Sequence, residues 1–163
     1  MRLQVPIFAC SLVLFLLCCS ARSGKAADKN QMMADSPSPV SVTSVLVSGP
    51  EHEYTFSVTI KSTDTGCEQY ADWWEVLDTE GNLIYRRVLA HSHVNEQPFT
   101  RSGGKVAISG DRQVYVRGHM NNSGYGSAVI KGSVNTGFSP DSLDISFAGD
   151  LEHSEPLPED CAF

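Results

Sequence analysis

Apolar and polar residues alternate without interruption in the segment YTFSVTIKS, residues 54–62. The apolar members fall on one side of an extended chain: Tyr54, Phe56, Val58 and Ile60. A period of two predicts a β-strand with one buried face. The preceding segment, VSVTSVLVSG, is rich in β-branched residues, but its alternation slips between Val42 and Val45, as in a bulged strand.

The segments that follow have the same short period and are separated by turn residues. ADWWEVLDTEGNLIYRRVLAH predicts a hairpin that turns at residues 78–82, where Gly81 or Asn82 can adopt a positive φ. KVAISGDRQVYVRGHM predicts a second strand pair, and SAVIKGSV and LDISFAG predict two further short strands. Because no helical period of convincing length occurs, we expect an all-β fold, a single antiparallel β-sandwich of seven or eight strands. Its closest architecture would be the immunoglobulin or fibronectin type III kind.

The N-terminus differs from the rest of the chain. An apolar run of about fifteen residues follows Arg2, and it is shorter than the roughly 20 residues that cross a bilayer as a helix. Residues 1–26 are therefore predicted to be a cleaved signal peptide, with cleavage after Ala21 or an uncleaved anchor as the alternatives. A lipid anchor on Cys18 or Cys19 is a weaker alternative, because leucine precedes the cysteines where a small residue is usual. We expect a secreted or periplasmic protein with no membrane span after cleavage.

Three further segments follow the signal peptide. Residues 27–39 are polar and end in SPSP, which predicts a disordered lead-in. Residues 40–150 are expected to form the one β-sandwich domain. Residues 151–163 are acidic and interrupted by proline, which predicts an irregular C-terminal tail.

Removal of the signal peptide changes the cysteine count and the charge. Of five cysteines, Cys67 and Cys161 remain, and in an oxidising compartment they are predicted to form a disulfide, with two free thiols as the alternative. Three of the 12 basic residues and no acidic residue are lost, so nine basic residues face 19 acidic ones, a net charge of about −10. A surface this acidic repels a phosphate backbone, so we expect no nucleic-acid partner.

The stretch RVLAHSHVNEQPFTRSGG contains a candidate metal site. If the strand period continues, His91 and His93 lie on one face about 7 Å apart, and both can reach one cation. His119 and Glu96 are the candidate further ligands, and copper or zinc is the metal that imidazole ligands suit. The alternative is that the histidines are polar residues at a strand end, because their spacing matches no specific signature.

Three arginines, Arg86, Arg87 and Arg101, lie near this stretch in an acidic chain. A guanidinium group binds carboxylate or phosphate through two hydrogen bonds, and Arg87 and Arg101 are the candidates for binding an anion. The structural alternative is an ion pair with Glu96, Asp72 or Glu75. Glu75 lies across the predicted hairpin from residues 86 and 87, so it can face an arginine there.

Aromatic residues form a second candidate contact surface. Trp73 and Trp74 are neighbours in a strand and therefore face opposite sides, so one belongs to the core. An exposed Trp73 beside Tyr70 could stack on a sugar or on an apolar patch of a partner. The alternative is that both tryptophans are covered.

The motifs GCEQYADWWEV and HSHVNEQPFTRSGG, followed by VRGHM and GYG, resemble a family of hypothetical secreted bacterial proteins. The resemblance spans residues 48–126, implies an extracytoplasmic bacterial protein and implies no catalytic residue. No G-x-S-x-G or H-E-x-x-H motif occurs. We therefore expect a binding or structural module for an unknown protein or small-molecule ligand. The alternatives are a metal-binding protein that uses His91, His93 and His119 and, more weakly, an enzyme with its site on residues 91–104.

Overall fold

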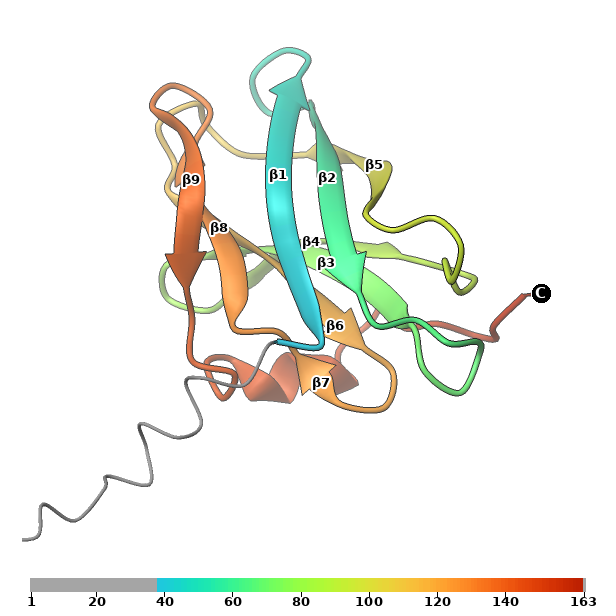
Figure 1. Ribbon diagram of the computed structural model, residues 1–163. Coiled ribbons are helices and arrows are strands. Elements are labelled where there is room, and N and C mark those ends of the chain that lie inside the picture. Colours follow the sequence, from blue (N-terminus) through green and yellow to red (C-terminus); the bar gives the residue numbers. More distant parts are fainter. Residues whose placement is uncertain (1–37, 163) are drawn as a thin grey trace, which may run out of the picture. The chain divides into compact units, whose positions relative to one another are not determined.

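The computed structural model describes residues 38–162, and nine β-strands and one short 3₁₀ helix make up its regular structure (Figure 1). In chain order the elements are β1 (Val40–Ser48), β2 (Tyr54–Ser62), β3 (Ala71–Asp78), β4 (Leu83–Val88), β5 (Phe99–Val106), β6 (Val114–Met120), β7 (Gly124–Tyr125), β8 (Ala128–Ser133), β9 (Gly137–Ser142) and the 3₁₀ helix η1 (Gly149–His153). The predicted signal peptide and nearly all of the predicted lead-in lie outside the described residues. Within residues 38–162, no helix has the length and apolarity needed to cross a membrane.

The two strands predicted from local alternation are present. In β2 the four predicted core residues are all buried, while Thr55 between them is exposed. β1 pairs with β2 in antiparallel fashion, and the register shifts between Val42 and Ser44. This bulge is the slip in alternation that the sequence shows, because an extra residue on one strand moves the following side chains to the other face.

The strands join into one sheet in the order β4-β3-β6-β8-β1-β2-β5, with β7 paired to β6 and β9 paired to β8. All pairings are antiparallel except that of β1 with β8, which joins Ser41 to Ala128. The two ends of the sheet approach each other, since the backbone N–H of Gly104 in β5 donates to the hydroxyl of Tyr85 in β4 at 3.0 Å. The sheet is therefore mixed and nearly closed into a barrel.

The all-β prediction is confirmed, but the immunoglobulin or fibronectin type III sandwich is not. Such a sandwich has two separate antiparallel sheets, whereas here the parallel contact between β1 and β8 joins the strands into one sheet. Nine strands occur in the described part of the chain, where seven or eight were expected. The unpredicted strands are β9 and the two-residue β7, which is too short to have a recognisable period. The strand predicted in LDISFAG, residues 143–149, is wrong, because this segment forms turns that lead into η1.

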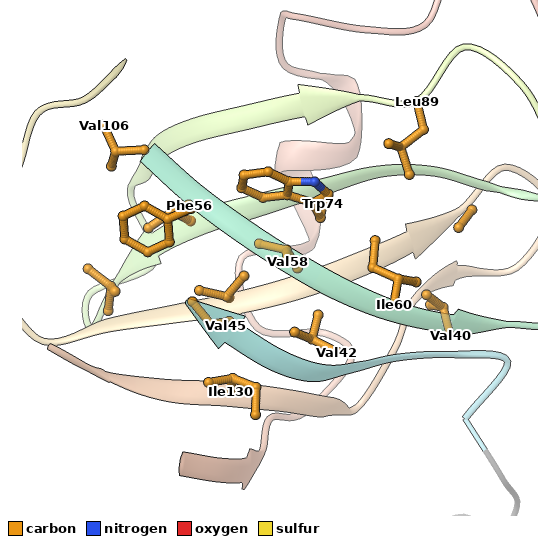
Figure 2. Close-up of a cluster of buried hydrophobic side chains, with 14 of the residues drawn as sticks. Val40, Val42, Val45, Phe56, Val58, Ile60, Trp74, Leu89, Val106 and Ile130 are labelled. Atoms are coloured by element: carbon orange, nitrogen blue, oxygen red, sulfur yellow. The ribbon is translucent and has the colours of Figure 1, made fainter. Parts of the chain in front are cut away.

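The interior of the barrel is filled by side chains from β1, β2, β3, β5, β6 and β8 (Figure 2). Trp74 and Phe56 lie at its centre and have no exposed surface. Around them pack aliphatic residues from several strands, among them Val42, Val45, Val58, Ile60, Val106 and Ile130. Burial of this apolar surface is the main contribution to the stability of the fold.

β3 is buried on both faces, because all eight of its residues are buried. Trp74 and Val76 point into the barrel, and the alternate residues Trp73, Glu75 and Leu77 point outward. The outward face is covered by the C-terminal segment, residues 147–161, which includes η1. Only its residues from 151 onward were predicted to be an irregular tail. The sequence pattern of a half-buried strand does not apply here, since a second layer of chain covers the sheet.

The structure corrects the prediction that His91 and His93 continue a strand. β4 ends at Val88, and residues 89–98 form an irregular loop. The backbone N–H of His93 donates to the Asp64 carboxylate at 2.8 Å instead of to a neighbouring strand. His93 is consequently buried, whereas His91 is exposed.

Candidate functional site

The predicted disulfide between Cys67 and Cys161 is present, with the two Cα atoms 5.7 Å apart. It joins the loop between β2 and β3 to the end of the C-terminal segment across 94 residues of sequence. The backbone N–H of Ala162 also donates to the carbonyl of Ala90. The end of the segment is thus attached to two loops at one end of the barrel.

A buried cluster of charges lies beneath the C-terminal segment. Glu75 in β3 faces Arg86 in β4 on one side and Arg117 in β6 on the other. Arg86 donates to Oε2 of Glu75 at 2.6 and 2.8 Å, and Nε of Arg117 donates to Oε1 at 2.8 Å. The guanidinium groups also lie over aromatic rings, Arg86 at 4.4 Å from the centre of Trp73 and Arg117 at 3.4 Å from that of Tyr125.

The two arginines hold the C-terminal segment through their remaining N–H groups. The acceptors are backbone carbonyls: Phe147 and Ala148 for Arg117, and Leu151, Ser154 and Pro156 for Arg86. No residue of η1 is buried, so apolar packing contributes little to the position of this helix. Charge-assisted hydrogen bonds from buried arginines therefore fix the segment on the sheet.

Asp72 and His119 form a second buried pair. Nδ1 of His119 donates to Oδ1 of Asp72 at 2.7 Å, and the imidazole stacks on the indole of Trp73 with ring centres 3.6 Å apart. The pairing of β3 with β6 shifts register between Ala71 and Trp73, which makes Asp72 the extra residue of a bulge. A bulge redirects a side chain, and in this way Asp72 reaches His119 beside Trp73.

Two open depressions adjoin this pair. The tail depression, about 400 Å³, lies between the sheet and the end of the C-terminal segment and is lined by Cys67, Tyr70, Asp72, Asn121, Glu159 and Asp160, among others. The histidine depression, about 390 Å³, is lined by residues that include Asp72, Trp73, His119, Asn121, Glu152 and His153. Both volumes are in the range of small-ligand sites. Since Asp72 and Asn121 line both, the two depressions are neighbours.

The pair presents two further polar atoms to these depressions. A carboxylate only accepts hydrogen bonds, so Nδ1 of His119 donates the proton of this hydrogen bond. Neither Nε2 of His119 nor the second oxygen of Asp72 has a hydrogen-bond partner among the described residues. Asp72 is 4% exposed and His119 is 6% exposed. Within residues 38–162, the buried polar atoms that lack a partner include neither of these two, so both are available to a ligand at the depressions.

The structure brings His91 and His93 together, with ring centres 4.5 Å apart. His93 stacks on Phe99 at 3.7 Å, and neither of its ring nitrogens has a hydrogen-bond partner within residues 38–162. Burial lowers the pKa of His93, and the positive charges of Arg101 and His91 lower it further, against the opposing effects of Asp64 and Glu96. His93 is thus held as a neutral ring. In the part of the chain that the structure describes, no three His, Cys, Asp or Glu side chains form a group that could hold a metal ion.

The remaining candidate residues lie in different places. Arg101 forms an ion pair with Glu96 at 2.8 Å, which is the structural alternative stated for it, and Arg87 is exposed on β4. Trp73 and Tyr70 are buried, so neither ring is an exposed platform. They lie at the two depressions, Trp73 beside His119 and Tyr70 beside Asp72.

Sequence analysis paired neither Arg117 with Glu75 nor Asp72 with His119. One predicted possibility was that Glu75 lies opposite Arg86, because the two residues belong to the same hairpin. Arg117 is 42 residues from Glu75, and Asp72 is 47 residues from His119. A signal was present in the two acidic residues that interrupt the apolar run ADWWEV, since carboxylates in a strand buried on both faces require partners.

Comparison with known proteins gives a likeness over part of the chain. No family model matches it, and no solved structure matches it. The chain is 43% identical over 75 residues to a protein of Halomicrobium mukohataei named "Putative lipoprotein". The matched part is 46% of this chain and 37% of that relative, so the chain spans well under half of the relative's length. The comparisons therefore place the chain in no family, and the resemblance to secreted bacterial proteins stays a prediction.

Proposed function

We propose that the protein is an extracytoplasmic binding module and that its ligand site consists of the tail and histidine depressions. The observation that carries this proposal is the Asp72–His119 pair, whose second carboxylate oxygen and second ring nitrogen have no partner among the described residues and lie at the depressions. A ligand in either depression could hydrogen-bond to these atoms, because the pair itself leaves them free.

Binding is better supported than catalysis. An Asp–His pair can activate a nucleophile, but the residues that line the histidine depression include no serine, threonine, lysine or free cysteine within the described part of the chain. The two cysteines beside the tail depression are joined in the disulfide. The enzyme alternative on residues 91–104 gains no support from the loop, where His93 is buried against Phe99 and Arg101 is paired with Glu96.

Three observations support the extracytoplasmic location. The apolar N-terminal run has the length of a signal peptide, and disulfides form and persist in oxidising compartments. The relative's printed name is the third, and it also favours the lipid-anchor alternative at Cys18 or Cys19. Fractionation of the native host and the intact mass of the mature protein test this part. A mature protein that retains residues 1–26 in the cytoplasm would contradict it.

The site itself can be tested by nuclear magnetic resonance with a small-molecule fragment mixture. We expect the amide signals that shift to belong to residues 70–73, 119–122 and 157–161, because these residues surround the two depressions. A third depression, lined by Asp78, Glu80 and Arg112 at the other end of β3, is an internal comparison. Shifts confined to that third depression, or the absence of any binder, would contradict the proposal.

Metal binding is the second candidate function. The observation in its favour is the 4.5 Å separation of the His91 and His93 rings, together with the unpartnered nitrogens of His93 among the described residues. His119 belongs to a different cluster, paired with Asp72, so it does not complete a three-histidine group. Titration calorimetry with Zn²⁺ and Cu²⁺ on the wild type and on His93→Ala tests this function. Equal and weak binding to both proteins would dismiss it.

A further inference from the structure

We infer that Asn121 carries an N-linked glycan, attached to its side-chain amide by the secretion pathway of the host. This inference rests on the extracytoplasmic location in the proposed function, because this modification is made on chains that leave the cytoplasm. The evidence is the sequence of the turn after β6, the exposure of that turn and the hydrogen bonds of the Asn121 side chain.

The turn between β6 and β7 contains the acceptor sequence for N-linked glycosylation. The sequence is Asn121-Asn122-Ser123, in which the serine follows the first asparagine by two positions and the intervening residue is not proline. No other asparagine of the chain is followed by serine or threonine at this spacing. The sequence therefore indicates a single acceptor, Asn121.

The fold places this sequence where an enzyme can reach it (Figure 1). The backbone N–H of Ser123 donates to the carbonyl of Met120 at 3.4 Å, which closes a β-turn. All three residues of the acceptor sequence are exposed, although Met120 before them and Tyr125 after them are buried. The turn therefore presents the acceptor sequence to solvent at the end of the sheet.

The side chain of Asn121 is oriented by two hydrogen bonds and keeps one N–H group. Its Oδ1 accepts from the backbone N–H of Tyr70 at 3.0 Å, and its Nδ2 donates to the carbonyl of Cys67 at 2.8 Å. A side-chain amide nitrogen has two N–H groups, and the second one has no partner within residues 38–162. A sugar can therefore replace the second hydrogen while both hydrogen bonds remain.

The reaction requires a sugar donor, whose class is a lipid-phosphate-linked oligosaccharide of the host membrane, and a transferase of the host. Nδ2 of Asn121 attacks the anomeric carbon of the first sugar, and the bond from that carbon to the phosphate oxygen breaks. The bonding electrons leave with the phosphate, and the proton lost from Nδ2 passes to a basic group of the transferase. The product amide retains one N–H, so the hydrogen bond to Cys67 is kept.

Asn135 provides a comparison within the same chain. It is exposed in the turn between β8 and β9, and its Nδ2 also donates one hydrogen bond, to Asp111 at 2.7 Å. The residue two positions after it is Gly137, which has no hydroxyl group. Asn135 is therefore an exposed asparagine without the acceptor sequence, and it should stay unmodified.

Mass spectrometry of the protein purified from the extracytoplasmic fraction of its native host tests this inference. Trypsin releases residues 118–131 as one peptide, because Arg117 precedes it, Lys131 ends it and no lysine or arginine lies between them. We expect this peptide to carry the added mass of a series of sugar residues. Fragmentation should place that mass on Asn121.

Two variants of Ser123 expressed in the host separate recognition from folding. Ser123→Ala removes the acceptor sequence but keeps Asn121 and both of its hydrogen bonds, because the Ser123 side chain takes part in neither. We expect this variant to fold and to lose the added mass completely. Ser123→Thr is the matched control, since it retains the acceptor sequence and should keep the added mass.

The outcomes separate the inference from the proposed function. An unmodified peptide in the extracytoplasmic protein would overturn the glycan while supporting the location. An unmodified peptide in a protein that is found only in the cytoplasm would overturn both. Sugar that fragmentation places on Ser123 or on Asn135, or that persists in Ser123→Ala, would overturn the assignment to Asn121.

Discussion

Arg86 donates two hydrogen bonds to a single carboxylate oxygen of Glu75, and neither side chain is exposed to solvent. Arg117 binds the other oxygen, so one buried carboxylate lies between two buried guanidinium groups of neighbouring strands. Each guanidinium group then binds carbonyls of the C-terminal segment. The ion pairs therefore connect the sheet to the last residues of the described chain.

We predict that Glu75→Gln strongly destabilises the protein. Removing one partner from a buried ion pair leaves uncompensated charge and typically costs about 3–5 kcal/mol, and here two arginines lose their counter-ion. Urea denaturation measures the change in the free energy of unfolding. Glu53→Gln is the control, because its pair with Lys105 is exposed and should contribute less than about 1 kcal/mol. Similar unfolding midpoints for the two variants would refute the role assigned to Glu75.

Loss of the Cys67–Cys161 disulfide should destabilise the fold and release the end of the C-terminal segment. Closing a loop of this length contributes about 4–5 kcal/mol in the chain-entropy model. The double variant Cys67→Ser/Cys161→Ser should therefore unfold at a lower urea concentration and be cleaved sooner by protease within residues 155–162. Mass spectrometry of the alkylated wild type gives the direct check. Two modified thiols in the unreduced mature protein would show that the bond does not form.

Phe56→Ala should abolish or badly weaken folding. Phe56 is fully buried and packs edge to face against Phe138 with ring centres 5.9 Å apart. Truncation of such a residue costs roughly 3–5 kcal/mol, a large part of the roughly 5–15 kcal/mol typical of a domain. Thr55→Ala, at an exposed position of the same strand, is the control and should be nearly silent. Equal melting temperatures would mean that the faces of β2 are assigned wrongly.

Stability should fall below about pH 6.5 because of His93. Its pKa is lowered in the folded protein, chiefly by burial, from an ordinary value of 6.5 in the unfolded chain. Above pH 6.5 both states are neutral at this residue. As the pH falls from 6.5 toward the folded pKa, the unfolded state takes up the proton first, so the free energy of unfolding decreases.

His93→Phe tests this pH dependence, because the phenyl ring keeps the stack on Phe99 without a titrating nitrogen. We expect its free energy of unfolding to vary less than that of the wild type between pH 7.5 and 5. His153→Gln, at a side chain that is 81% exposed, is the control and should follow the wild type. If the free energy of unfolding of His93→Phe fell as steeply with decreasing pH as that of the wild type, the pH dependence would come from other groups.

Local features of the structure could be predicted from the sequence because they depend on neighbouring residues. The alternation in β2, the bulge after Val42 and the turn at residues 78–82, where Gly81 has φ 90°, all follow from short-range sterics and patterning. The disulfide could be predicted from the compartment and the number of cysteines that remain there. The facing of Glu75 and Arg86 could be predicted because the two strands belong to one hairpin.

Only the tertiary structure decided how distant segments meet. The sequence does not indicate that β1 contacts β8 in parallel, so it could not distinguish one nearly closed sheet from a sandwich. It also could not show that the loop after Val88 buries His93 or that the last residues cover β3, since both depend on partners far along the chain. The Asp72–His119 pair depends on a register shift between two strands 47 residues apart. Strand register is set by the packing of the whole sheet, so a local pattern predicts strands but not which side chains they bring together.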